Sequence, residues 1–258
     1  MGTVGYALRD HVAHIGLAGA AGTNPIDQSL VDSLGDAVRR ARADDAHVVV
    51  IEGSERAFSV GGDVAAFAAA RDIERSVDDL AESLHRVISE LHRMDAIVVS
   101  AVRGVAAGAG VALAAAADVV LAGSNARFTL AYTKIGFSPD GGTSLLTASI
   151  GLHRAMWLAL ANPVLTAEEA HAMGLVSQVI PDGRFEDAVA DAVGLLRAGS
   201  RAAQVATKRL LRETATPGAE VALRRESLSI RTRASSPDGA EGIAAFLDKR
   251  VPRFPGNG

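Results

Sequence analysis

Two short segments rich in glycine and alanine have the composition of loops that bring backbone N–H groups close to a ligand. Residues 57–64 read AFSVGGDV and residues 104–112 read GVAAGAGVA. Small residues leave N–H groups unscreened, and the helical pattern after each segment adds the partial positive charge of a helix start. Two N–H groups that converge on one oxygen would form an oxyanion hole. Each segment alone is also explained as a tight strand-to-helix turn, with Asp63 as an N-cap.

A third segment, residues 137–143 (FSPDGGT), contains a candidate general base, Asp140. Its neighbours in the sequence include four large apolar residues, Ile135, Phe137, Leu145 and Leu146. An apolar setting disfavours the ionised carboxylate, which raises its pKa toward that of a useful base. The alternative is a plain turn, since Pro-Asp-Gly is a common turn sequence. It occurs at residues 139–141, 181–183 and 237–239.

Other chemistries have weak support. The chain has no cysteine, which excludes disulfides, thiol nucleophiles and cysteine-based metal sites. The histidines show no HxH or HxxxH spacing, so we expect no metal site. His85 and His92 are expected to be solvated. No GxSxG elbow is present, and the partial dinucleotide fingerprint at residues 108–113 lacks the acidic residue about 20 positions later.

The glycine-bearing segments follow runs that are typical of buried strands. Residues 47–52 (HVVVIE), 96–102 (AIVVSAV) and 118–122 (DVVLA) are continuous apolar runs, which indicate strands covered on both faces of a sheet. Residues 6–17 alternate around a central Arg-Asp pair and predict a β-hairpin. Strands separated by helical patterns imply right-handed crossovers and a largely parallel sheet.

Helical periodicity fills most of the remaining chain. Residues 71–95 carry apolar residues at intervals of three and four, which predicts a long amphipathic helix. An earlier helix is expected to open at Asn24-Pro25. Residues 53–63 are expected to form a loop. After Gly141 the pattern is helical almost to the end, which indicates an α/β core with a helical tail.

Composition and charge limit the classes of partner. The chain has 258 residues, of which 48% are hydrophobic, and a net charge of −4, so it offers no strongly basic face for nucleic acid. Its first residues lack the pattern of a secretory signal. The most apolar stretch, residues 105–121, is interrupted and too short to span a membrane comfortably. We therefore expect a soluble, cytoplasmic protein without nucleic-acid or membrane partners.

The three segments, in their order and spacing, resemble the crotonase (enoyl-CoA hydratase/isomerase) superfamily. AFSVGGDV resembles the pattern AFxAGxD, residues 103–122 resemble NGxxxGxGxxLALxxD, and residues 126–146 resemble the ARFxxPExxxGxxPxxGGT region. Residues 165–180 and 236–256 resemble the family's later conserved stretches, so the likeness covers essentially the whole chain. The resemblance implies a spiral of ββα repeats over residues 1–195. It also implies a C-terminal helical region over residues 196–258 for trimerisation and CoA contact, in homotrimers or dimers of trimers.

The resemblance also assigns roles to residues. It places the oxyanion-hole N–H groups on Gly62 and Ala109. The two glutamates of family hydratases would fall at Ala112 and Tyr132, neither of which supplies a carboxylate at neutral pH. The PDGGT segment is instead similar to the branch of enoyl-CoA and 1,2-epoxyphenylacetyl-CoA isomerases that use one aspartate, here Asp140.

The implied substrate is an acyl-CoA, so coenzyme A enters as part of the substrate and no separate cofactor is expected. Family members often carry a basic residue before the first helix, and none lies between Arg9 and Arg39. Arg56 can still meet phosphates. The residues implied to bind the substrate are Arg56, Ala57, Phe58, Val60, Gly61, Val64, Gly108, Gly110, Tyr132, Phe246 and Lys249.

Taken together, the residues and the resemblance predict a shift of a double bond from 3-enoyl-CoA to 2-enoyl-CoA, with Asp140 as acid and base. Another crotonase reaction that uses Asp140, such as epoxide isomerisation, thioester hydrolysis or residual hydration, is an alternative. A non-catalytic acyl-CoA-binding protein is a second alternative, because Ala112 and Tyr132 replace both glutamates.

Overall fold

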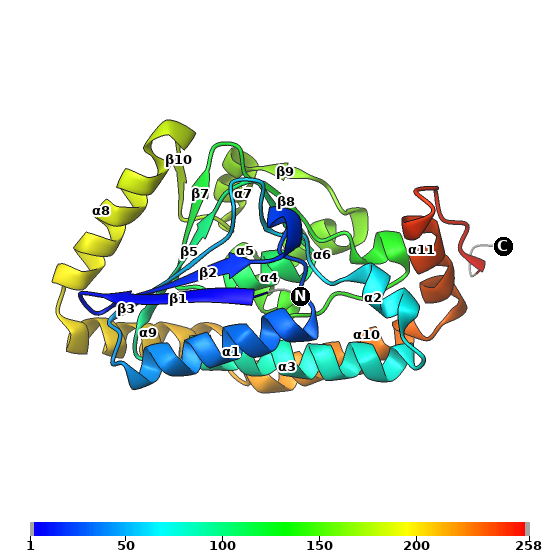
Figure 1. Ribbon diagram of the computed structural model, residues 1–258, viewed down its shortest axis with the longest axis horizontal. Helices are drawn as coiled ribbons and strands as arrows, with labels where there is room; N and C mark the ends of the chain where they lie inside the picture. The colour runs from blue at the N-terminus through cyan, green and yellow to red at the C-terminus, as the bar shows by residue number, and fades with distance from the viewer. Residues whose placement is uncertain (1–2, 256–258) are drawn as a thin grey trace.

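The computed structural model describes residues 3–255, which are built around a six-stranded, mostly parallel sheet (Figure 1). The strand order is β1-β2-β3-β5-β7-β10, and only the β1–β2 pair is antiparallel. This confirms the N-terminal hairpin and the parallel sheet. The strands are β1 (Thr3–Arg9), β2 (Val12–Ala18), β3 (Val48–Glu52), β5 (Ile97–Val102), β7 (Val119–Gly123) and β10 (Gln178–Ile180).

A smaller sheet, in the order β4-β6-β8-β9, lies next to the first. Its strands are β4 (Ala57–Ser59), β6 (Val105–Ala107), β8 (Arg127–Thr129) and β9 (Leu165–Thr166). Each pair β3–β4, β5–β6 and β7–β8 gives its first strand to the large sheet and its second to the small one. The expectation that residues 53–63 form only a loop was wrong. Phe58 is fully buried, and β4 pairs with β6.

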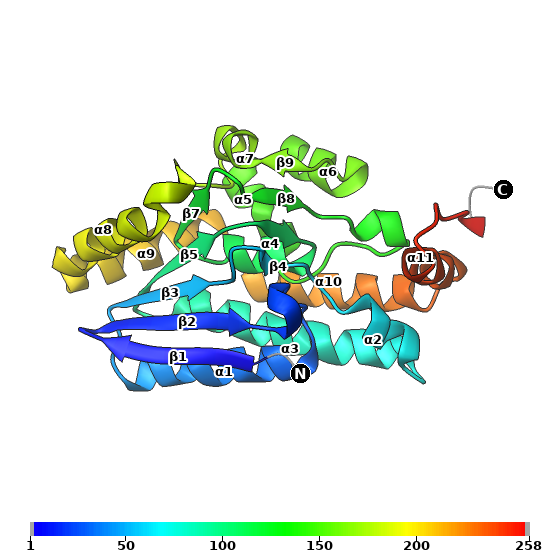
Figure 2. The ribbon, with the colours of Figure 1, turned by 45° about the horizontal axis from the view of Figure 1, so that its top comes forward.

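The continuous apolar runs are explained by helices on both faces of the large sheet. Val48 and Val50 of β3 pack with residues of α8, whereas Val49 and Ile51 belong to the main core on the other face. On that side α1, α3 and α10 run side by side (Figures 1 and 2). The helices are α1 (Gln28–Ala43), α2 (Val64–Ala69), α3 (Ile73–Arg93), α4 (Ala109–Ala115), α5 (Leu146–Ile150), α6 (Leu152–Ala161), α7 (Ala167–Met173), α8 (Phe185–Ala198), α9 (Arg201–Ala215), α10 (Ala219–Ala234) and α11 (Pro237–Leu247).

The first helix begins later than the sequence suggested. Its N-cap is Asp27, whose carboxylate accepts a hydrogen bond from Leu30 N at 2.7 Å. Asn24 is instead buried, and its side-chain amide donates to the carbonyl groups of Ala57 and Phe58. The expected opening at Asn24-Pro25 was therefore wrong, because Asn24 ties the chain to β4 rather than starting a helix.

The other expected elements are confirmed with small changes in their bounds. The long amphipathic helix is α3, and the chain after Gly141 is helical apart from short turns and strands β9 and β10. The last helix, α11, packs against α2 and residues 132–135. A Cβ on Gly242 would lie 2.1 Å from the carbonyl oxygen of Ile135, so this contact requires glycine. Among the described residues, no helix has the length and apolar character needed to cross a membrane.

Candidate active site

The two glycine-bearing segments lie against each other at one edge of the small sheet. Strands β4 and β6 are parallel, so the loops that follow them emerge on the same side. A Cβ on Gly61 would lie 2.7 Å from the carbonyl oxygen of Ala107 and 3.4 Å from Gly108 Cα. Gly61 and Gly108 also have φ values of +83° and +52°. Glycine at both positions therefore lets the two backbones touch.

The N–H groups of Gly62 and Ala109 are left without acceptors. An isolated parallel bridge joins Ile26 to Gly62, but its hydrogen bonds run from Ile26 N to Gly61 O and from Asp63 N to Ile26 O. The bridge therefore bypasses Gly62 N. Ala109 N opens helix α4. Within the described residues, neither N–H group makes a hydrogen bond that the structure records, so both can serve an external oxygen.

A cavity of about 380 Å³ brings these N–H groups together with Asp140. Most of its wall is apolar. From α2 and α3 come Phe67, Val77, Leu80, Ala81 and Leu84, and from elsewhere Ile26, Phe137 and Ile230. Of the residues expected at the site, the cavity is lined by Val60, Gly61, Gly62, Val64, Gly108, Ala109, Tyr132, Asp140 and Phe246.

Five expected binding residues do not line this cavity. Arg56 and Lys249 are exposed, while Ala57 and Phe58 are buried within β4. Gly110 faces β4, since a Cβ there would lie 2.6 Å from the carbonyl oxygen of Ser59. Glycine at position 110 thus permits close packing of α4 on β4, which is a different reason from the expected contact with substrate.

Asp140 sits in a turn that is held by its backbone, not by its carboxylate. Its carbonyl oxygen accepts hydrogen bonds from the Tyr132 hydroxyl at 2.9 Å and from the Thr143 hydroxyl at 2.7 Å. The residue is only 5% exposed. Burial raises the pKa of Asp140, and the negative charge of Glu226 raises it further. His85 and the Gly141 N–H act in the opposite direction, because both stabilise the carboxylate. The pKa remains raised, which is the direction that the sequence predicts.

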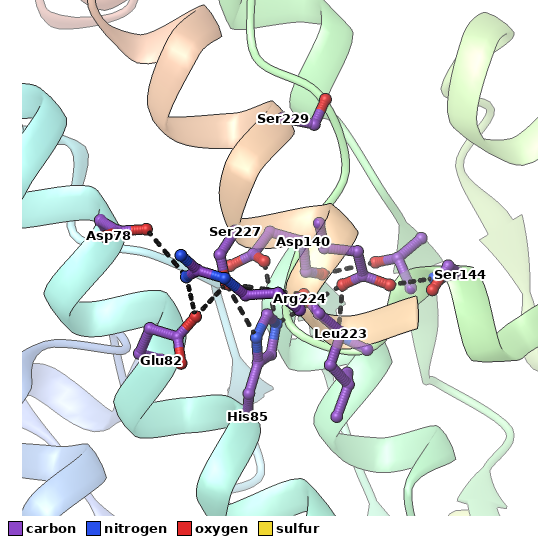
Figure 3. Close-up of polar contacts among 12 residues, drawn as sticks. Asp78, Glu82, His85, Asp140, Ser144, Leu223, Arg224, Ser227 and Ser229 are labelled. Carbon is purple, nitrogen blue, oxygen red and sulfur yellow. Dashed lines mark hydrogen bonds and ion pairs between the residues drawn. The ribbon is translucent and has the colours of Figure 1, made fainter. Parts of the chain in front are cut away.

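His85 contradicts the expectation that it is solvated. It is 5% exposed, and its Nε2 lies 2.9 Å from Asp140 Oδ1 (Figure 3). The same nitrogen lies 3.6 Å from Glu226 Oε2. The contact with Asp140 is an ion pair rather than an aligned hydrogen bond. Burial opposes a charge on His85, but the two carboxylates outweigh it and raise its pKa to about 9. The signal was in the sequence, because His85 follows Ala81 by four residues and so falls on the buried face of α3.

Glu226 of α10 is the second residue that sequence reasoning missed. It is 6% exposed and follows buried Leu223 by three residues, again on the inner face of its helix. Its two carboxylate oxygens accept hydrogen bonds from Gly142 N at 2.7 Å and Ser144 N at 2.6 Å. Glu226 therefore fixes the backbone immediately after Asp140.

His85, Asp140 and Glu226 each offer one potential ligand atom, and these three atoms lie within 4.8 Å of one another, a grouping that can hold a metal ion. The observed contacts fit an ion-pair cluster better. The 2.9 Å between Nε2 and Oδ1 is the distance of a direct ion pair, and both Glu226 oxygens already accept backbone N–H groups. The expectation of no metal rested on spacing along the chain, which does not reveal such tertiary groupings.

The positions expected to replace the hydratase glutamates are both buried. Ala112 lies inside α4, and Tyr132 lies at the cavity wall. Burial raises the pKa of Tyr132 well above its usual value, with the nearby charges of Asp140 and Glu226 adding to the effect. Tyr132 therefore stays a neutral phenol, and neither position supplies a carboxylate.

Comparisons with known proteins agree along the whole chain. A family model described as enoyl-CoA hydratase/isomerase matches residues 8–257. A probable enoyl-CoA hydratase from Rhodobacter capsulatus is 36% identical over 255 residues, which cover 98% of each chain. The 1,2-epoxyphenylacetyl-CoA isomerase of Escherichia coli is 33% identical over 245 residues, or 90% of each chain. The crystal structure of an enoyl-CoA hydratase from Mycobacterium avium subsp. paratuberculosis matches with a TM-score of 0.88 and 34% identity, over 97% of this chain and 98% of that one.

Proposed function

Because the chain belongs to the enoyl-CoA hydratase/isomerase family and has the crotonase fold, we propose that it is an acyl-CoA isomerase that uses Asp140 as its acid and base. The names of its relatives include hydratases as well as an isomerase. The choice between these reactions therefore rests on the side chains of the site.

The observation that carries the proposal is a single available carboxylate beside two unpaired N–H groups in an apolar cavity. Two acidic residues line the cavity, Asp63 and Asp140. The carboxylate of Asp63 accepts a hydrogen bond from Ala66 N and so caps α2. Asp140 is left as the group that can take up a proton from a bound thioester. A hydratase of the usual family type would need two carboxylates here.

In the proposed reaction, the thioester oxygen of a 3-enoyl-CoA binds between Gly62 N and Ala109 N. This polarises the carbonyl and acidifies the protons on C2. Asp140 removes one C2 proton, and the two N–H groups stabilise the negative charge of the resulting dienolate. Asp140 then returns the proton to C4, which gives the conjugated 2-enoyl-CoA. No water is consumed.

The magnitudes suit this chemistry. One oxyanion-hole donor contributes about 10²–10³ in rate, and one general base contributes about 10²–10⁴. The donors act in a cavity whose wall is mainly apolar, where their electrostatic effect is greater than in water. Together these terms match the task of removing the α-proton of a thioester.

The test is a panel of substrates given to the wild-type protein. We expect turnover of 3-enoyl-CoA, followed by the appearance of the conjugated thioester's ultraviolet absorbance, and little change in 2-enoyl-CoA. A preference for 1,2-epoxyphenylacetyl-CoA would point to the epoxide alternative, and CoA release would indicate hydrolysis. Binding without turnover of any of these, measured by calorimetry, would indicate a non-catalytic acyl-CoA-binding protein and refute the proposal.

We also propose that the protein assembles as a homotrimer or a dimer of trimers. In support, α6 exposes a group of large apolar side chains, Leu152, Met156, Trp157 and Leu160. Exposed apolar groups of this kind are typical of interfaces. Light scattering coupled to size-exclusion chromatography gives the mass directly, and a monomer at micromolar concentration would contradict this part of the proposal.

A further inference from the structure

We propose that His85 is a positioning residue that, as an imidazolium held between two carboxylates, keeps Asp140 ionised inside the apolar cavity. The inference rests on the proposed function, because it explains how the base of that reaction stays available. His85 does not line the cavity, so it acts through Asp140 rather than on the substrate.

The contacts of the two ring nitrogens are those of an imidazolium. On one side, the Ser227 hydroxyl donates to Glu82 Oε1 at 2.9 Å, so its oxygen is free to accept from His85 Nδ1 at 3.2 Å (Figure 3). On the other side, Nε2 faces Asp140 Oδ1 at 2.9 Å and Glu226 Oε2 at 3.6 Å. An unprotonated Nε2 would set its lone pair against Glu226 Oε2, an oxygen that already accepts the Gly142 N–H. Both nitrogens therefore carry protons, and the ring is a cation.

Asp140 needs this cation because burial and the charge of Glu226 oppose its ionisation, against which the Gly141 N–H is the other favourable contact. Asp140 is buried away from water. Glu226 places a second carboxylate beside the same nitrogen of His85 that Asp140 contacts. Both carboxylate oxygens of Glu226 accept backbone hydrogen bonds, from Gly142 N and Ser144 N, so Glu226 faces His85 as an acceptor. A cation within about 4–6 Å lowers the pKa of a carboxyl group by about 1–3 units.

The remaining charges near His85 largely balance one another. Glu82 of α3 pairs with Arg224 of α10 at 2.6 Å, and Asp78 lies 3.9 Å from the same guanidinium. Asp78 also pairs with Arg231 at 3.4 Å. Glu82 is linked to the Nδ1 side of the ring through Ser227. The charge that bears most directly on Asp140 is therefore that of His85.

The decisive variant is His85→Gln, which keeps a polar side chain but removes the charge. We expect the acid limb of the kcat/KM profile to move upward by about 1–3 pH units, the scale of a lost neighbouring cation. The acid limb moves upward because, without the nearby cation, Asp140 stays protonated, and therefore inactive as a base, up to a higher pH. At high pH, where Asp140 ionises without help, the rate should approach that of the wild type. A histidine that only packs would lower the rate equally at every pH, which would overturn the inference.

A matched control lies on the same helix. His92 hydrogen-bonds to Arg212, and burial together with the positive charge of Arg212 lowers its pKa to about 4, so it is a neutral histidine. His92→Gln removes no charge and should leave the acid limb in place. An equal shift in both variants would mean that general disturbance of α3, rather than the charge of His85, moves the profile.

Nuclear magnetic resonance tests the inference without turnover. The ring nitrogens of His85 in the wild-type protein should show the imidazolium form at neutral pH, and the Asp140 carboxyl should titrate at higher pH in His85→Gln. A neutral His85 at pH 7 would overturn the inference even if isomerase activity is found. Conversely, an imidazolium and a shifted Asp140 titration in a protein without isomerase activity would uphold it while the proposed function fails.

Discussion

Replacing Asp140 with asparagine removes the proposed acid and base of the reaction. The substitution keeps the size of the side chain and removes its ability to take up a proton. We expect turnover of 3-enoyl-CoA to fall by at least about 10³-fold, or roughly 4 kcal/mol of barrier, the scale of a lost general base. Binding should persist, since the two N–H groups of the oxyanion hole are backbone groups.

The structure also predicts that this variant folds. The turn at Asp140 is held by its carbonyl oxygen, which accepts from Tyr132 and Thr143, and by Glu226, which accepts from Gly142 N and Ser144 N. None of these bonds uses the carboxylate of Asp140. The loss that remains is its contact with His85, whose ring keeps Glu226 as a partner. We expect unfolding free energy to fall by at most about 3 kcal/mol, the scale of one lost buried partner.

The assay needs three proteins besides the wild type, each carrying Asp→Asn in one of the Pro-Asp-Gly sequences. Asp182 lies in an exposed turn and Asp238 lies in the first turn of α11, so substitution at either should leave turnover almost unchanged. Initial rates and calorimetric binding of a saturated acyl-CoA are measured for all three. Similar rates in all three variants would refute the assignment of Asp140.

Further expectations follow from the same geometry. Hydration of crotonyl-CoA should stay below about 1 per second, since Ala112 and Tyr132 supply no carboxylate; faster loss of the 2-enoyl absorbance would contradict this. Gly62→Pro should lower turnover by about 10²–10³-fold in a protein with normal circular dichroism, because it removes one oxyanion donor; Gly62→Ala keeps the N–H, places its Cβ 3.1 Å from the Phe67 ring, and should lose less activity than Gly62→Pro. Gly110→Val should lower the melting temperature, because its Cβ would lie 2.6 Å from the carbonyl oxygen of Ser59. An unchanged melting temperature would show that this contact relaxes freely.

The parts of the fold that sequence could predict are those with long, repeated patterns. The core strands are continuous apolar runs because both of their faces are covered, and α3 shows its period over many turns. Strand β4 has three residues, too few to show any period. The start of α1 was misplaced because Asn24 and Asp27 are both good N-cap residues, and only the tertiary contact of Asn24 with β4 decides between them.

The residues of the site that the sequence did not predict are those whose role depends on tertiary contacts. The loops that carry Gly62 and Ala109 stand out because small residues follow buried strands there, and the family resemblance then assigned these two positions. Asp140 stands out by its apolar neighbours in the sequence. His85 and Glu226 lie on α3 and α10, and each was hidden as a polar residue within an apolar helix face. Reading such residues as buried would have predicted that each needs a partner. It could not have told which partner, because that depends on how the two helices pack beside the Asp140 turn.

Tyr132 has a role of its own at one of the two positions where the family resemblance would place a glutamate. At the position where a family hydratase would hold a carboxylate, its hydroxyl donates to the carbonyl oxygen of Asp140. A carboxylate there would face that carbonyl with no proton to donate and would add a third negative charge beside Asp140 and Glu226. The phenol instead fixes the turn that carries the base and remains neutral. The tyrosine at position 132 therefore supports the aspartate in the turn. We expect that Tyr132→Glu alone lowers the isomerase activity that depends on Asp140 and does not produce hydration.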